Sequence, residues 1–80
     1  MRRYYFDLVD GDDIATDEEG VELPDVQVAQ EEAALALAAL VREMRSSVHR
    51  AGIFELAIDV RDNAGLVMRV GFDIEDRTVQ

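Results

Sequence analysis

The stretch that decides the fold is FELAIDVRDNAGLVMRVGFDI, residues 54–74. On both sides of the central Asp-Asn-Ala-Gly sequence, apolar side chains alternate with polar or small ones, as in two strands that each bury one face. The apolar members are Phe54, Leu56, Ile58, Val60, Leu66, Met68, Val70, Phe72 and Ile74. This pattern predicts a β-hairpin with one face in the core.

The turn chemistry sets the expected register of this hairpin. A three-residue loop favours glycine at its last, left-handed position, which makes Asn63-Ala64-Gly65 the loop and pairs Asp62 with Leu66. In this register, core-facing residues of one strand meet core-facing residues of the other, as one buried face requires. On the opposite face, Asp59 is expected to lie directly across from Arg69.

The first third of the chain predicts a second hairpin. Tyr4, Phe6 and Leu8 share one face of a strand, and Asp10-Gly11 begins a turn. Residues 14–17 then form a short returning strand, and residues 21–23 a brief extended segment that ends at Pro24.

A long helix is expected between the two hairpins, from about Val26 to about Ala51. Asp25 is the expected N-cap, and Gly52 fits the left-handed position that follows a helix. Apolar residues recur at steps of three and four and form one stripe toward the core. They are Val26, Ala29, Ala33, Leu37, Leu40, Val41, Met44 and Val48.

These elements predict an α+β fold of one domain covering residues 1–80. Two β-hairpins flank one long helix in the order ββ(β)αββ, and a single sheet carries the helix on one face. The pattern leaves open whether the strand at Tyr4 runs parallel or antiparallel to the strand at Phe54.

Composition excludes several classes of function. The chain has no cysteine and no lysine, so disulfides, thiolate catalysis, cysteine-based zinc sites and Schiff-base chemistry are ruled out. A formal net charge of −10 disfavours binding to nucleic acid. The acidity is explained by solubility, with a basic protein partner as the alternative. No apolar run reaches the roughly 20 residues of a membrane span. Because an aromatic strand, and no apolar leader, follows Met1-Arg2-Arg3, we expect a cytoplasmic location.

Few residues are candidates for chemistry. The acidic residues Asp10, Asp12, Asp13, Asp17, Glu18 and Glu19 lack the spacing of an EF-hand loop, so we predict no metal site. Ser46 and His49 are three residues apart on the expected helix, which is weak evidence for a catalytic pair. We therefore predict no catalytic residue, no cofactor and no enzymatic activity, with a small enzyme that lacks a recognisable motif as the alternative.

Five residues are candidates for protein interaction. Val28, Leu35 and Ala39 project roughly opposite the core stripe of the helix, and Ala57 lies across from Gly71 on the sheet face away from the core. Apolar surface of this kind predicts a homodimer, since like surfaces can pair around a two-fold axis. The sequence thus favours a small, acidic, non-catalytic interaction module that associates with itself.

Two stretches carry a resemblance to known proteins. Residues 3–6 (RYYF) and 20–25 (GVELPD), followed by an Ala/Glu-rich helix, resemble a family of short bacterial proteins of unknown function, common in alphaproteobacteria such as rhizobia. The order of elements is also similar to the N-terminal domain of HicB-type antitoxins, which neutralise a small basic RNA-cleaving toxin. That likeness implies an alternative function, an antitoxin-like inhibitor of a small basic toxin or another nucleic-acid-binding protein. No counterpart of the DNA-binding segment of these antitoxins is recognisable in the chain.

Overall fold

The computed structural model describes residues 1–43 and 53–75, and within them one helix and five strands. In chain order these are β1 (Arg2–Asp10), β2 (Asp13–Ala15), β3 (Val21–Leu23), α1 (Val26–Glu43), β4 (Ile53–Asp62) and β5 (Gly65–Glu75). The predicted α+β fold is confirmed, with strands before and after the helix.

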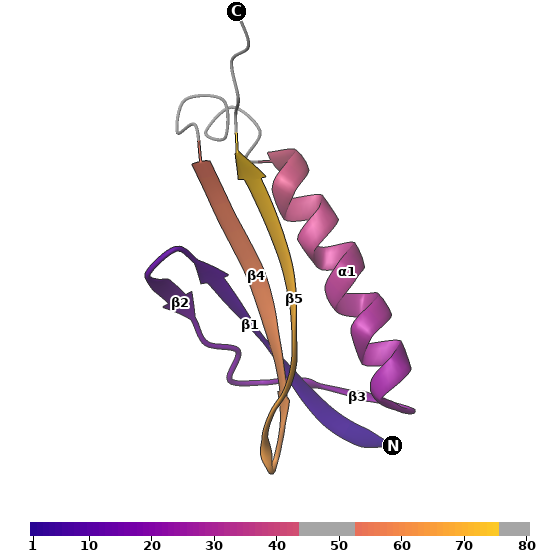
Figure 1. Ribbon diagram of the computed structural model, residues 1–80. Helices are drawn as coiled ribbons and strands as arrows, with labels where there is room; N and C mark the ends of the chain where they lie inside the picture. Colours follow the sequence, from indigo (N-terminus) through magenta and orange to yellow (C-terminus); the bar gives the residue numbers. More distant parts are fainter. Residues whose placement is uncertain (44–52, 76–80) are drawn as a thin grey trace, which may run out of the picture.

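All strand pairs are antiparallel, and β1 lies inside the sheet, in the order β2-β1-β4-β5 (Figure 1). The outer edge of β1 is shared by two short strands, because β3 pairs with residues 2–4 and β2 with residues 8–10. On its other edge, β1 pairs with β4 over residues 5–10. The strand at Tyr4 is therefore antiparallel to the strand that contains Phe54, which answers the question that the sequence left open.

The helix α1 lies against β4 and β5 and contacts β3 with its first half (Figure 1). Its buried residues Ala29, Ala33 and Leu37 pack on one face of the sheet. Two of these three side chains are single methyl groups, so the helix axis can approach the strands closely. The other members of this core are Tyr4, Leu56, Ile58 and Val60.

The helix begins where the sequence predicts. The Asp25 carboxylate accepts a hydrogen bond of 2.9 Å from the backbone N–H of Val28, which satisfies one of the free donors at the helix start. No helix in the described segments combines the length and apolar character of a bilayer-crossing segment. The predicted end of the helix near Ala51, with Met44, Val48 and Gly52, lies outside the described residues.

The predicted core stripe is wrong at its first residue. Val26 is 43% exposed, whereas Ala29, one turn later, is fully buried. The first residue of α1 thus lies at the margin of the core and not within it. Leu40 and Val41 are half-buried against the core, as the stripe predicts.

The predicted register of the second hairpin is confirmed over most of its length. Val60 lies opposite Met68, and Asp59 lies opposite Arg69 on the face away from the helix. The Arg69 guanidinium donates hydrogen bonds of 2.5 and 2.9 Å to the two Asp59 carboxylate oxygens, a bidentate pair that fixes this register.

The predicted turn is wrong by one residue. Asp62 pairs with Gly65 and Arg61 with Leu66, so the loop is the two residues Asn63 and Ala64. A β-bulge follows, in which β5 contains one extra residue, Val67, relative to β4. The bulge restores the predicted register at Met68. Because of this bulge Leu66 leaves the core face, and it is 66% exposed.

We expect Leu37→Ala to lower the free energy of unfolding by roughly 2–5 kcal/mol, because the truncation leaves a cavity beneath α1. Leu37 is 4% exposed and belongs to the core. Leu66→Ala makes the same chemical change at an exposed site and should stay within about 0.5 kcal/mol of the parent. Urea denaturation of both variants is the measurement, and equal losses would show that the core stripe is misassigned.

Candidate functional site

The five predicted interaction residues lie on two separate surfaces. Leu35 is 68% exposed and Ala39 is exposed on α1, with Val28 half-buried on the same side. Ala57 and Gly71 lie on the sheet face that points away from α1, because their neighbours in β4 and β5 are the residues that pack beneath the helix. One flat interface cannot contain all five.

The surface on α1 is a straight row on the side of the helix opposite its buried residues, which we call the outer seam. It follows the three- and four-residue spacing that keeps side chains on one side of a helix. Leu35 is its largest apolar member, and Ala39 lies beside it. The outer seam consists of Val28, Glu31, Leu35, Ala38 and Arg42.

The surface on the sheet is a row of small and apolar residues that crosses four strands. Gly71 lies opposite Ala57, Ala57 opposite Val9, and Val9 opposite Ile14, so the row runs from β5 to β2. Directly paired residues in antiparallel strands share a face, which places all four on the face away from α1. Ile14 at the end of the row is 62% exposed, whereas Val9 and Ala57 are buried. The predicted pair of Ala57 and Gly71 thus belongs to a longer row.

A charged network lies beside this row on the same sheet face. Asp7, buried in the middle of β1, receives the Nε–H of Arg61 at 2.7 Å on one carboxylate oxygen. Its other oxygen accepts the backbone N–H of Asp17 at 2.9 Å. Arg61 also donates a hydrogen bond of 2.8 Å to the carbonyl oxygen of Asp17, and its guanidinium lies 4.6 Å from the centre of the Tyr5 ring. These contacts join β1, β4 and the segment between β2 and β3.

Asp17 fills the gap between the two short edge strands. Its carboxylate accepts the backbone N–H of Phe6 at 3.1 Å, where neither β2 nor β3 pairs with β1. The other oxygen accepts the N–H groups of Glu19 and Gly20, both at 3.2 Å. One side chain thus replaces a missing stretch of strand and closes the turn that leads into β3.

Gly20 is required at the close approach that follows. Its φ is +70°, and a Cβ atom there would lie 2.9 Å from the Tyr4 carbonyl oxygen and 2.9 Å from the Tyr5 ring. Both the left-handed backbone and the lack of space favour glycine. The segment 16–20 is therefore held tightly against β1.

The pKa shifts in this region come from its pairing. Partial burial raises the pKa of Asp17, but the three backbone N–H groups and the Arg61 guanidinium outweigh it, and the net pKa lies below the ordinary value. The hydrogen bond from Arg69 lowers the pKa of Asp59 against an opposing effect of burial. The Asp7 carboxylate raises the pKa of Arg61. All these shifts favour the charged forms, so none of the three groups is poised for proton transfer near neutral pH.

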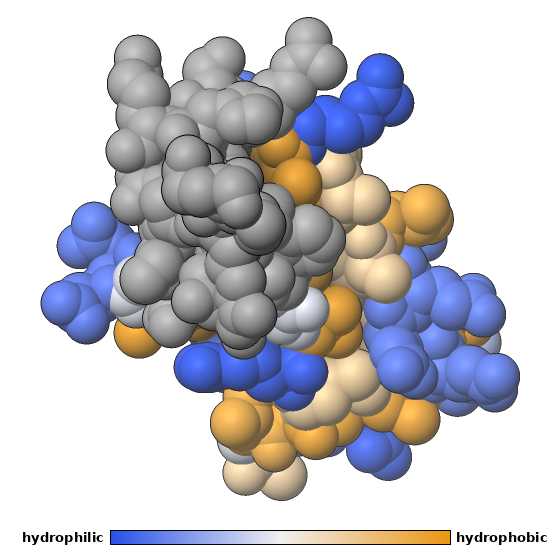
Figure 2. Space-filling model, turned by 45° about the horizontal axis from the view of Figure 1, so that its top comes forward, coloured by the Kyte–Doolittle hydropathy of each residue, from blue (hydrophilic) through white to orange (hydrophobic). Residues whose placement is uncertain are grey.

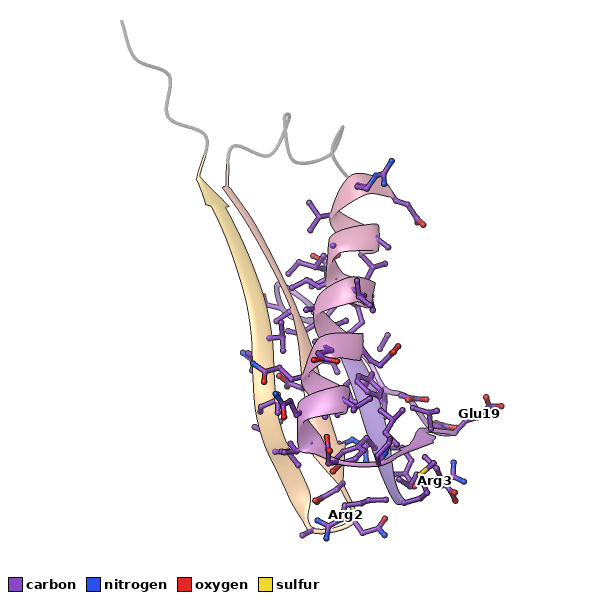
Figure 3. The ribbon with its side chains drawn as sticks, turned by 90° about the vertical axis from the view of Figure 1, so that its right-hand side faces the viewer. Arg2, Arg3 and Glu19 are labelled. Atoms are coloured by element: carbon purple, nitrogen blue, oxygen red, sulfur yellow. The ribbon has the colours of Figure 1, made fainter. Side chains whose placement is uncertain are left out.

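The end of the molecule where β1 begins carries further pairs (Figure 3). Arg3 donates to the Glu19 carbonyl oxygen at 2.8 Å and to the Glu22 carboxylate at 3.2 Å. Arg2 lies 3.6 Å from the Asp62 carboxylate beside the β4–β5 turn. These contacts anchor β3 and the turn to β1 at an exposed edge, where ion pairs add little stability.

Two hollows lined by described residues are both small. One, of about 190 Å³, lies between α1 and the sheet and is lined by Phe6, Val21, Leu23, Glu32 and Ala36. The other, of about 270 Å³, lies beside the β4–β5 turn. Both fall below the range of about 300–1,000 Å³ that is typical of small-molecule sites. On the face that Figure 2 shows, apolar and polar side chains are interspersed outside the grey residues.

The predicted acidic cluster divides in the structure. Asp17 turns toward β1, whereas the other five side chains are exposed: Asp10, Asp12, Asp13, Glu18 and Glu19. Among residues 1–43 and 53–75, no three carboxylate or imidazole groups are arranged to hold a metal ion. The pair Ser46 and His49 lies outside the described residues.

Sequence reasoning missed the network of Asp7, Asp17 and Arg61. The one available signal was Asp7, a carboxylate within an aromatic and apolar strand. Such a residue on a partly buried face needs a partner. Alternation could not identify that partner, because Arg61 is 54 positions away and Asp17 lies in a turn.

Comparison with known proteins gives one result. A family model described as a domain of unknown function (DUF6894) matches residues 3–76. This match confirms the resemblance to a family of unknown function that residues 3–6 and 20–25 indicate. No curated protein and no solved structure shows significant similarity to the chain. The likeness to HicB-type antitoxins stays a prediction.

We expect the free energy of unfolding to fall as the pH drops below the ordinary aspartate pKa of about 4. The folded-state pKa of Asp17 is lowered, so its carboxylate stabilises the fold above that pH and loses the effect as the pH falls through the folded value. Asp17→Asn should be less stable at pH 7, because one amide oxygen cannot replace two accepting oxygens, and its stability should depend less on pH. Urea denaturation between pH 2.5 and pH 7, with Asp12→Asn as the exposed control, measures this. An Asp17→Asn profile that parallels the parent would contradict it.

Arg61→Met should destabilise the protein more than Arg69→Met. Arg61 contacts a buried carboxylate, a carbonyl oxygen and an aromatic ring, whereas the described partner of Arg69 is the Asp59 carboxylate at a more exposed site. Loss of Arg61 leaves the Asp7 charge at a site largely removed from water. Thermal denaturation of the two variants at pH 7 gives the comparison. Equal midpoints would show that Arg61 acts only as an exposed ion pair.

Proposed function

We propose a function for this chain, which belongs to the family described as a domain of unknown function (DUF6894). The protein is a small, acidic, non-catalytic interaction module that associates with itself. A surface on α1 would bind the second copy, and the acidic turns would stay free for a basic protein.

The observation that carries this proposal is the outer seam. Leu35 is 68% exposed in the middle of α1, and the exposed alanines at positions 38 and 39 surround it. A single exposed leucine is common on protein surfaces. Here it belongs to a row on a helix whose opposite side packs on the sheet through Ala29, Ala33 and Leu37, which is the arrangement of a helix with two partners.

The charged network supports a structural role and not a catalytic one. Asp7, Asp17 and Arg61 bind one another and the backbone, and their contacts hold three parts of the chain together. An active site needs polar groups that converge on a space for substrate. The two described hollows are small, and the network lines neither of them.

The exposed carboxylates support a basic protein as the second partner. Asp10, Asp12 and Asp13 lie at the β1–β2 turn, and Glu18 and Glu19 in the next turn, along one edge of the sheet. Together with a net charge of −10 they produce a negative field that attracts basic surfaces and repels nucleic acid. This is also the feature that an inhibitor of a basic toxin would need.

The charge of each copy opposes self-association. Two copies that carry −10 each repel one another, but salt screens this repulsion beyond about 8 Å at physiological ionic strength. Apolar contact acts only at touching distance and is not screened. We therefore expect association to be stronger at moderate salt than at low salt.

Leu35→Glu tests the proposal. It should shift the protein toward monomer, because it removes the largest apolar side chain of the outer seam and adds a charge there. Gln30→Glu adds the same charge at an exposed position of α1 outside the outer seam and should behave like the parent. Sedimentation at several protein and salt concentrations gives the association constants. A parent that stays monomeric at high micromolar concentration in every buffer would contradict the proposal.

A further inference from the structure

We infer that the outer seam pairs two copies of α1 in antiparallel orientation, with Glu31 of each copy bound to Arg42 of the other. The inference rests on the self-association proposed above and adds its geometry. It follows from the spacing of the five seam residues and from the position of their charges.

The outer seam has the spacing of a helix–helix contact. Successive members are three, four, three and four residues apart, so they repeat every 3.5 residues on average. This is the pattern by which two helices keep one side in contact along their length. The seam from Val28 to Arg42 spans about 21 Å along the axis of α1, which gives the contact nearly four turns.

The charges select the orientation. The single acidic seam residue, Glu31, lies in the first half of α1, and the single basic one, Arg42, lies in the last turn. A parallel pair would place each charge beside the same charge of the second copy. In an antiparallel pair, each charge lies beside its opposite, and the two-fold symmetry creates the contact twice.

The charges also select the register. The two-fold axis of this pair passes between residues 36 and 37 of each helix. Leu35 then lies opposite Ala38 of the second copy, and Glu31 lies opposite Arg42 of the second copy. A shift of one heptad in one direction places Glu31 opposite Leu35. A shift in the other direction places Arg42 opposite Ala38. For the four seam residues from Glu31 to Arg42, only the first register pairs Leu35 with an apolar residue and Glu31 with a base.

The small side chains at the centre fit this arrangement. Ala38 in the seam and Ala39 beside it are exposed and lie between the two charged positions. Alanine at a helix contact lets the two axes approach to about 8 Å, so that Leu35 fills the space above Ala38 of the second copy. The Glu31–Arg42 pairs lie about 16 Å apart, one on each side of this centre.

The surface is small, so the dimer is expected to be weak. One face of a single helix falls below the area that stable dimers bury. Association is therefore expected in the micromolar range, where single charge changes in a symmetric interface are easy to measure because each counts twice.

Exchange of the two charges tests the inference. Glu31→Arg and Arg42→Glu each place like charges together at both contacts and should weaken homodimerisation about tenfold. An equimolar mixture of the two single variants should associate like the parent, because every contact between them joins opposite charges. The double variant Glu31→Arg/Arg42→Glu should also recover, and it keeps the net charge of the parent.

The control separates this geometry from overall charge. Glu18→Arg changes the net charge as much as Glu31→Arg but lies in an exposed turn, and its dimerisation should not weaken. Sedimentation equilibrium of each variant and of the mixture, with circular dichroism to verify folding, is the measurement. Recovery in the mixture and in the double variant supports the antiparallel pair.

Other outcomes overturn the inference in distinguishable ways. If Leu35→Glu dissociates the dimer but the two single charge variants associate like the parent, self-association stands and the antiparallel register falls. The register also falls if the single variants weaken association and neither the mixture nor the double variant recovers it. If the parent is monomeric under all conditions, the proposed function falls together with this geometry.

Discussion

The carboxylate of Asp17 is the constraint on which the arrangement of this fold depends. The outer edge of β1 is covered by two strands of only three residues each, and the backbone between them would otherwise be open. One Asp17 oxygen accepts the Phe6 N–H at the break, while the other closes the turn toward Gly20. The chain is thereby directed back along β1 into β3, and from there into Pro24 and the start of α1.

Arg61 extends this constraint across the sheet. By binding both Asp7 and the Asp17 carbonyl oxygen, it links the inner strand β4 to the segment that covers the far edge of β1. The sheet is therefore held by side chains on one face and by the packing of α1 on the other. Charged residues thus stabilise the sheet on the face opposite to the one that α1 covers.

Much of the fold could be predicted from the sequence, because most of it is local. Alternation from Leu56 to Val70 fixed the faces of β4 and β5, and Asp25 marked the helix start. The failures are of two kinds. The bulge after Gly65 is a choice between backbone geometries of similar energy, and alternation alone does not reveal it. The Asp17 contacts depend on where a turn packs in space, which no periodicity encodes.

The residues of the candidate surfaces could be predicted, but their arrangement in space could not. Leu35 and Ala39 are found on the outside of α1, as their helical positions imply, and Ala57 and Gly71 on the sheet face opposite to it. The row that joins Ala57 and Gly71 to Val9 and Ile14 can be recognised only when the strand order is known. The sequence could not supply this order, because neighbouring strands β1 and β4 are separated by the whole helix.

The same long separation governs how the chain reaches its fold. The contact between Asp7 and Arg61 spans 54 residues, so the inner edge of β1 has no partner until residues 56–61 of β4 have been synthesised. During synthesis the inner edge of the aromatic strand β1 therefore stays unpaired, which is a state prone to aggregation. The negative charge of the neighbouring turns repels other copies of the chain, which opposes aggregation in that state.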